Sequence, residues 1–494
     1  MGNQSHAKEG FFHSNLLYVG KNNRIYKEAG IYILLQAFLP MTEFLRKAHV
    51  FCLIATFSTI GVSVSISQAF LVLSFCFGFG HTLRSRPASN WFPKHLLFYL
   101  SVALFVWYFL DFLVHLLSGE DAFYFERAFN SELKDFFLFF GFLSVWFLKE
   151  EDIPKAFTGL VILFLVLIFT GIIGGFSPVR LSRLVSDLYK ESSAYKFTHP
   201  LGTFAKIPLY ISIGLMNTHL TFGGLLQFFS GFAVFRFLKD LGSENKKKIL
   251  QSGLFLFLFA FVCLLNQARS SLIGAFCSIS LATLHLFWIR KELPTSYLIR
   301  GGFAFLTISI LLGLGLAFSP AGKKVLGPIF GKEKHTDSGR TFIWDSTFPL
   351  IAAHPIIGVG PGNYNRSIET VRMEHSETYP ELAYFYEVTQ KGHAHNDYFH
   401  FTSVFGVPSL LIYLSIAALF SFFLLQSRQP LNRLIFYYGI FGFFVSGLFQ
   451  CYFQDDEVVI LFWLIIGLFV RGEWKPSDSD GAKALSPSMR QSGK

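Results

Sequence analysis

Long apolar runs recur along the whole chain and are separated by polar connections. About twelve runs fall near residues 29–45, 49–82, 96–117, 133–148, 156–176, 201–235, 249–265, 271–289, 301–318, 401–426, 434–451 and 456–470. A helix needs roughly 20 such residues to cross a bilayer. Lipid cannot satisfy free backbone N–H and C=O groups, so these runs are expected to be helical. The pattern predicts an all-α polytopic membrane protein with about 12 transmembrane helices.

Two runs are too long for one crossing and too short for two. They are residues 49–82 and 201–235. The alternation of sides along the chain favours one net crossing for each, with a tilted, broken or re-entrant part.

Lysines and arginines concentrate in some of the connections, which is typical of the cytoplasmic side. These residues are Arg84, Arg86, Lys94, Lys149, Lys155, Arg236, Lys239, Lys246, Lys247, Lys248, Arg290, Lys291, Arg300, Arg428 and Arg433. Alternate crossings then place residues 118–130, 177–200, 266–270, 319–400 and 452–455 outside.

This topology divides the chain into five parts. Residues 1–28 form a cytoplasmic N-terminal segment, and residues 29–318 and 401–471 hold the transmembrane helices. Residues 319–400 form one large periplasmic loop that carries the site, and residues 472–494 form a disordered cytoplasmic tail, because they are rich in small and polar residues.

The composition agrees with a membrane protein. Only 15% of the residues are charged and 52% are hydrophobic, whereas about 25% charged is usual in soluble domains. The net charge of +10 is scattered between apolar runs, so no nucleic-acid partner is expected. The five cysteines are odd in number and lack a CxxC pair, which argues against a disulfide framework or a cysteine metal site.

The candidate chemistry lies in a polar stretch from Ser338 to Leu410, which contains SGRTFIW, HPIIGVGPGNYNRS and KGHAHNDYFH. Arg340 precedes TFIWDSTFPLIAAHP, a pattern typical of a short amphipathic helix on the membrane surface. Arg269 stands between two apolar runs, in LLNQARSSLIG. An arginine there indicates function more often than it indicates snorkelling to the interface. Two guanidinium groups at the outer interface would suit a lipid-linked diphosphate.

The histidine cluster HAHNDYFH offers an acid–base group. Its pattern is only half of a metallo-hydrolase signature, so we expect no bound metal. His393 and His400 are interpreted as structural. His395 precedes a polar residue at the start of an apolar helix, where a neutral imidazole could take a proton from a sugar hydroxyl. The glycines of GVGPGNY are expected to form a tight turn and to allow close backbone approach.

The motifs, in this order, resemble the O-antigen ligase family, a branch of the Wzy-type polymerase and ligase superfamily. The resemblance covers about residues 198–412 and includes HPLGTFAKIPLYI. It implies a GT-C-like helical bundle capped by one periplasmic loop, in the inner membrane of a Gram-negative bacterium. It also implies a metal-independent, inverting glycosyltransferase without a cofactor. Its donor would be an undecaprenyl-diphosphate-linked glycan and its acceptor a sugar of the lipid A core oligosaccharide, both met among membrane lipids.

The resemblance also assigns roles to particular residues. His395 takes the place of the family's essential histidine, and Arg269 and Arg340 take the places of its diphosphate-binding arginines. Arg180 and Arg183 are further candidate diphosphate contacts. Asn396 or Asp397 is expected to orient the imidazole.

Three alternatives stay open. An O-antigen or exopolysaccharide polymerase shares the loops and the lipid-linked donor, and a protein O-oligosaccharyltransferase uses another acceptor. A transporter or flippase is disfavoured because no repeated halves are visible and the polar residues concentrate in one outside loop.

Overall fold

Most of the apolar runs in the described part of the chain fold as helices, as their pattern predicts. The computed structural model describes residues 41–119, 121–185, 197–297, 299 and 339–474. A helix covers residues 41–60. The others are α2 (Val64–Ser85), α3 (Leu96–Leu117), α4 (Tyr124–Asn130), α5 (Asp135–Leu138), α6 (Phe140–Trp146), α7 (Ile153–Gly175), α8 (Leu181–Val185), α10 (His219–Gln227), α11 (Ser230–Asp240), α12 (Lys246–Asn266), α13 (Arg269–Thr283), α16 (Arg340–Ala353), α17 (Tyr364–Thr378), α18 (Ala383–Val388), α19 (Asp397–Gln426), α20 (Leu431–Ser446) and α21 (Asp456–Glu473).

Several of these helices have the length and composition of membrane spans. In the described part of the chain, 6 helices qualify, or 7 if α10 and α11, which meet at a bend of 40°, count as one span. The chain is therefore a multi-pass helical membrane protein. The predicted segment 1–28, the run 301–318 and most of the tail lie outside the described residues.

Residues 49–82 are a broken run, one of the expected possibilities, and contribute to two helices. The helix over 41–60 and α2 are joined by a short turn at Gly61 and Val62. They run antiparallel, since Phe44 packs edge-on against Phe77 and Phe51 against Phe70. A glycine within an apolar run broke it, and the run's hydropathy alone did not show where.

The expectation for residues 201–235 is wrong in its first third, which is not part of a membrane helix. Strands β1 (Pro200–Phe204) and β2 (Ile207–Tyr210) pair antiparallel there. Ala205 and Lys206 form the two-residue turn with φ values of 48° and 71°, which matches the twist of a hairpin. The fold is thus not purely helical, and the broken span that follows is α10 with α11.

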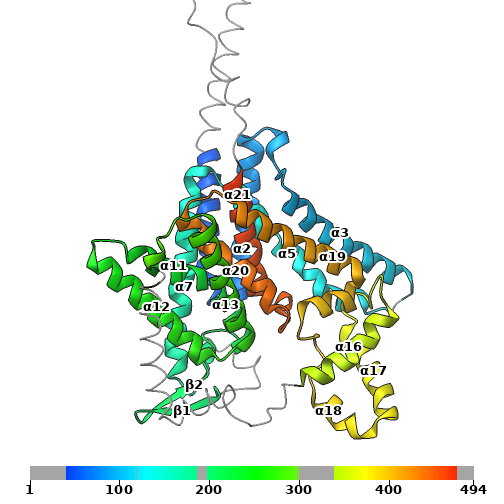
Figure 1. The fold of residues 1–494 in the computed structure, drawn as a ribbon. Coiled ribbons are helices and arrows are strands. Elements are labelled where there is room, and N and C mark those ends of the chain that lie inside the picture. Colours follow the sequence, from blue (N-terminus) through cyan, green and yellow to red (C-terminus); the bar gives the residue numbers. More distant parts are fainter. Residues whose placement is uncertain (1–40, 120, 186–196, 298, 300–338, 475–494) are drawn as a thin grey trace, which may run out of the picture.

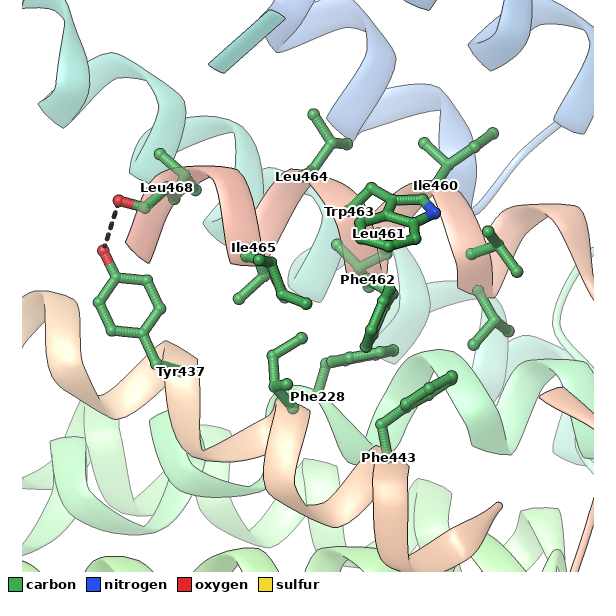
Figure 2. Close-up of a cluster of buried hydrophobic side chains, with 14 of the residues drawn as sticks. Phe228, Tyr437, Phe443, Ile460, Leu461, Phe462, Trp463, Leu464, Ile465 and Leu468 are labelled. Carbon is green, nitrogen blue, oxygen red and sulfur yellow. Dashed lines mark hydrogen bonds between the residues drawn. The ribbon is translucent and has the colours of Figure 1, made fainter. Parts of the chain in front are cut away.

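The core surrounds α21, which is apolar on all sides and buried on all sides. Figure 2 shows Phe462 and Ile465 of this helix on the side of Phe228, Tyr437 and Phe443, and Ile460 and Leu464 on the opposite side. Glycines allow the backbones to approach closely: a Cβ on Gly467 would lie 2.8 Å from the carbonyl oxygen of Phe142 in α6. This central helix fixes the segments at both of its ends.

Basic side chains tie the connections together at one end of the bundle. Arg86 donates to the carbonyls of Trp146, Phe147 and Leu148, and Arg471 donates to Leu148 as well. These are connections that the charge pattern predicts to share one side. Figure 1 shows the β-hairpin and α16–α18 together at the other end of the bundle. The assignment of the two ends to cytoplasm and periplasm stays a prediction.

Candidate active site

The segment of residues 447–455 joins α20 to α21 and binds three other parts of the chain. Its hydrogen bonds to them are Gly447 O with Asp397 N (2.8 Å), Leu448 O with Asn396 Nδ2 (2.9 Å), Gln450 Oε1 with His395 Nδ1 (2.7 Å), Tyr452 OH with Ser270 Oγ (2.9 Å), Phe453 N with Asp397 Oδ1 (3.0 Å) and Asp455 Oδ1 with Thr221 Oγ1 (3.1 Å). We call residues 447–455 the linking segment. It brings together the HAHND motif, helix α10 and the turn before α13.

His395 is held in a fixed orientation at this junction. Its φ is 49°, a left-handed backbone conformation that few residues other than glycine adopt. The backbone N–H of His395 donates to Nδ1 of His393 at 3.2 Å. Because Oε1 of Gln450 is an acceptor, Nδ1 of His395 carries the proton. In the neutral ring, Nε2 is then the free acceptor, as a general base requires.

The surroundings of His395 keep its ring neutral. Burial lowers the pKa of His395 below its ordinary value of 6.5. The hydrogen bond to Gln450 raises it in part, and the positive charge of Arg340 lowers it further. At neutral pH the imidazole is therefore an uncharged base, and a guanidinium lies close enough to affect it.

Arg340 is the first residue of α16 and lies beside the HAHND motif. One turn later, Trp344 donates its indole N–H to the carbonyl of Ala394 at 3.0 Å, which fixes the helix against that motif. The Nε atom of Arg340 is buried and has no hydrogen-bond partner among the described residues. A buried donor without a partner is costly, and an anionic ligand would satisfy it.

Arg269 is the first residue of α13 and has an exposed side chain. The turn before it is rigid, because Nδ2 of Asn266 donates to the carbonyls of Ser212 and His219 at 2.9 and 2.8 Å. Ser270, the next residue, bonds to Tyr452 of the linking segment. The backbone that carries Arg269 is thus fixed. It is tied to Tyr452, which is two residues after Gln450, the partner of His395.

Arg180 and Arg183 lie at the same end of the bundle. Arg180 donates to the carbonyl of Asn217 at 2.9 Å, in the loop that Asn266 also fixes. Arg183 is half-buried in α8. No hydrogen bond in the described part of the chain joins either arginine to His395, so the two belong to the periphery of the site.

The other polar residues of HAHNDYFH hold the backbone. Asn396 and Asp397, expected to orient the imidazole, bond instead to backbone groups of the linking segment and of α19. The ring is oriented by Gln450, which sequence reasoning missed. His400 is buried and lies 3.3 Å from a carboxylate oxygen of Glu132; its structural role stays a prediction.

The glycine loop turns tightly, which confirms its expected geometry. Gly358, Gly360 and Gly362 have φ values of 58°, 82° and 77°. Backbone N–H groups of residues 359 and 360 donate to carbonyls of α19 at 2.9 Å. These are the carbonyls left free beside Gly406, where α19 is locally non-helical. The loop and α19 therefore behave as one rigid piece.

Glu132 is the second functional candidate that sequence reasoning missed. It accepts from the N–H of Gly362 at 2.7 Å and faces His400. Its only sequence signal is its position as a carboxylate next to an apolar run. Gln450 gives an equally weak signal, because it is a single amide at the end of a different apolar run. Neither belongs to a recognisable motif, because their partners are far away in the chain.

These features define a class of protein: a multi-pass helical membrane protein with a neutral histidine and exposed or unsatisfied arginines at one end of the bundle. The described residues contain no group of three or more His, Cys, Asp or Glu that could hold a metal ion. The model of the O-antigen ligase family matches residues 254–414, a match that supports membership of this family. A comparison with curated proteins gave no match. Family membership supports a glycosyltransferase function of the ligase or polymerase type.

Proposed function

We propose that the protein is an O-antigen ligase. It transfers a glycan from undecaprenyl diphosphate to a sugar hydroxyl of the lipid A core, at the periplasmic face of the inner membrane of a Gram-negative bacterium. The observation that carries the proposal is the pairing of Nδ1 of His395 with Gln450 at 2.7 Å, beside Arg340. This pairing leaves a neutral Nε2 next to a cation.

In the proposed reaction the acceptor hydroxyl oxygen attacks C1 of the donor sugar from the side opposite the diphosphate. The bond from C1 to the diphosphate oxygen breaks, and its electron pair leaves with the diphosphate. The hydroxyl proton passes to Nε2 of His395. Attack from the opposite side inverts the configuration at C1. A second carboxylate, as in glycosidases, is not needed because diphosphate is already a good leaving group.

Arg340 and Arg269 stabilise the charge that develops on the departing diphosphate. Arg340 offers a buried donor without a partner, and Arg269 offers an exposed guanidinium on a rigid turn. Arg180 and Arg183 would contact the diphosphate from the adjacent loop. The mechanism uses no metal and no cofactor.

A transfer assay in proteoliposomes tests the function. His395→Ala should abolish transfer of the lipid-linked glycan while donor binding changes little. His375→Ala, the same substitution on the remote face of α17, is the matched control and should stay active. Unchanged transfer by the His395 variant would refute the assignment, and loss of activity in EDTA would refute metal independence.

The polymerase alternative rests on the same family match, because ligases and polymerases share it. A deletion strain separates the two. Loss of a ligase leaves lipid A core without O-antigen while lipid-linked polymer accumulates, whereas loss of a polymerase leaves core with a single repeat. Loss of glycan from a secreted protein would instead indicate a protein O-oligosaccharyltransferase.

A further inference from the structure

A polar cleft of about 450 Å³ lies at the end of the bundle that carries the site. Its walls are the end of α3, the loop that precedes α17 and one face of α17. Neither His395 nor the catalytic arginines line it, so the function proposed above leaves it without a role. Its volume is within the range of small-ligand sites, roughly 300–1,000 Å³.

Charged and hydroxyl side chains line the cleft and supply both donors and acceptors. Asp121 accepts from Arg127 at 2.7 Å and from Arg366 at 2.9 Å, and these bonds lower the pKa of its carboxyl. Ser367 and Thr370 follow Arg366 on the same face of α17. A carboxylate accepts hydrogen bonds only, a guanidinium donates only, and hydroxyls do both. Such a mixture suits a ligand whose own groups are hydroxyls.

The walls are fixed before any ligand arrives. Asn363 is buried, donates to the carbonyl of Val359 at 2.9 Å and accepts from Arg127 at 3.1 Å. A Cβ on Gly362 would lie 2.6 Å from the backbone of Arg127, so the two segments are in close contact. A preformed polar cleft loses little entropy when it binds.

The cleft is also mechanically joined to the site. The loop that forms one wall bonds through residues 359 and 360 to α19, the helix that begins directly after His395 and Asn396. A ligand in the cleft and a sugar at His395 would therefore share one rigid frame. Binding energy from a remote part of a substrate can position the reacting part.

We infer that this cleft is a saccharide subsite, which binds the hydroxyl groups of a sugar away from the bond that is formed. The inference rests on the proposed function, because the sugar belongs to the glycan of the donor or to the oligosaccharide of the acceptor. Asp121 and Arg366 hold adjacent hydroxyls of the sugar, and Ser367 and Thr370 bond to the remainder.

The test fills the cleft with an indole. Ser367→Trp and Thr370→Trp place it in the cleft, and Asn365→Trp places the same group on the opposite, exposed face of α17 as the matched control. Initial transfer rates are measured while the donor and the acceptor are titrated separately. The KM for one of the two should rise about tenfold in both cleft variants, because hydrogen bonds to that saccharide are lost. The substrate that is affected identifies the source of the sugar.

A second measurement does not depend on catalysis. The saccharides released by mild acid from the donor and from the acceptor are titrated into each tryptophan variant, and the indole fluorescence is recorded. The titration extends to about tenfold higher concentrations than the wild type needs, because the indole weakens binding without blocking it. One of them should change the fluorescence of Ser367→Trp and leave that of Asn365→Trp unchanged. Equal KM values in all three variants, with no fluorescence change, would overturn the subsite. If the wild type transfers nothing but the fluorescence responds, the proposed function fails and the subsite stands.

Discussion

Glu132 connects the glycine loop, through Gly362, to α19, through His400. Its removal should destabilise the protein strongly. Its carboxylate is buried, with a side chain 5% exposed. It accepts from Gly362 N at 2.7 Å and lies 3.3 Å from Nε2 of His400. Burial alone would raise the pKa of Glu132, but the hydrogen bond and charge of His400 lower it in total.

The size of the effect follows from what each substitution leaves behind. Glu132→Leu leaves the Gly362 N–H buried without its acceptor and removes the carboxylate beside Nε2 of His400, whose remaining partner there is Gln454 at 2.9 Å. This should cost about 3–5 kcal/mol. Glu132→Gln keeps an oxygen for Gly362 and loses only the charge, so about 1–2 kcal/mol is expected. Glu126→Gln, in the first turn of α4 on its exposed face, is the matched control and should change almost nothing.

The assay is unfolding of the purified protein in detergent, compared at one fixed heating rate because membrane proteins often unfold irreversibly. The unfolding midpoint should be highest, and equal, for the wild type and Glu126→Gln. It should be lower for Glu132→Gln and lowest for Glu132→Leu. The pKa of Glu132 is lower in the folded than in the unfolded state, so its contribution is present above the unfolded value of about 4.5 and is lost as the pH falls through the folded value. If Glu132→Leu has the same unfolding midpoint as the wild type at pH 7, the glycine loop and α19 are not coupled through Glu132.

Three further predictions concern the site. Gln450→Leu removes the acceptor of Nδ1 of His395, and transfer should fall about 10–100-fold at unchanged donor KM, measured by initial rates; a changed KM with normal kcat would contradict this role. Transfer should rise with pH and reach half its maximum below pH 6.5, the ordinary pKa of a histidine, and Arg340→Gln should move that midpoint upward in a pH–rate profile because it removes a nearby positive charge. Gly406→Ala forces a side chain at φ 75° against the backbone of Ile356, so a loss of about 2–4 kcal/mol is expected in the same unfolding assay; an unchanged midpoint would show that the loop can move away.

Sequence patterns predicted the elements that hydropathy and local chemistry determine. The helices, the tight turns at the glycine loop and the helix after Arg340 all depend on residues close in the chain. The hairpin at residues 200–210 was missed because its strands are as apolar as a spanning helix. The turn at Gly61 was missed because its neighbours on both sides are apolar. Hydropathy does not distinguish a broken run from a continuous one.

The contacts of the site were less predictable because they join distant parts of the chain. The motifs identified His395 and Arg340, which the structure brings together. They did not identify Gln450, which is 55 residues from its partner, or Glu132, which is 230 residues from Gly362. A single polar side chain at the end of an apolar run has no pattern of its own. The packing of the helices determines which group such a side chain faces.

The linking segment explains why a site in a membrane protein can depend on its last two helices. Residues 447–455 contain neither the proposed base nor a proposed catalytic arginine, yet they bond to the segments that carry His395 and Arg269. The buried helix α21 fixes one end of this segment and α20 the other. A shift of α21 by a fraction of an ångström would therefore move His395 and Arg269 together. Precise positioning of the base and the arginines thus comes from the apolar core and not from the loops themselves.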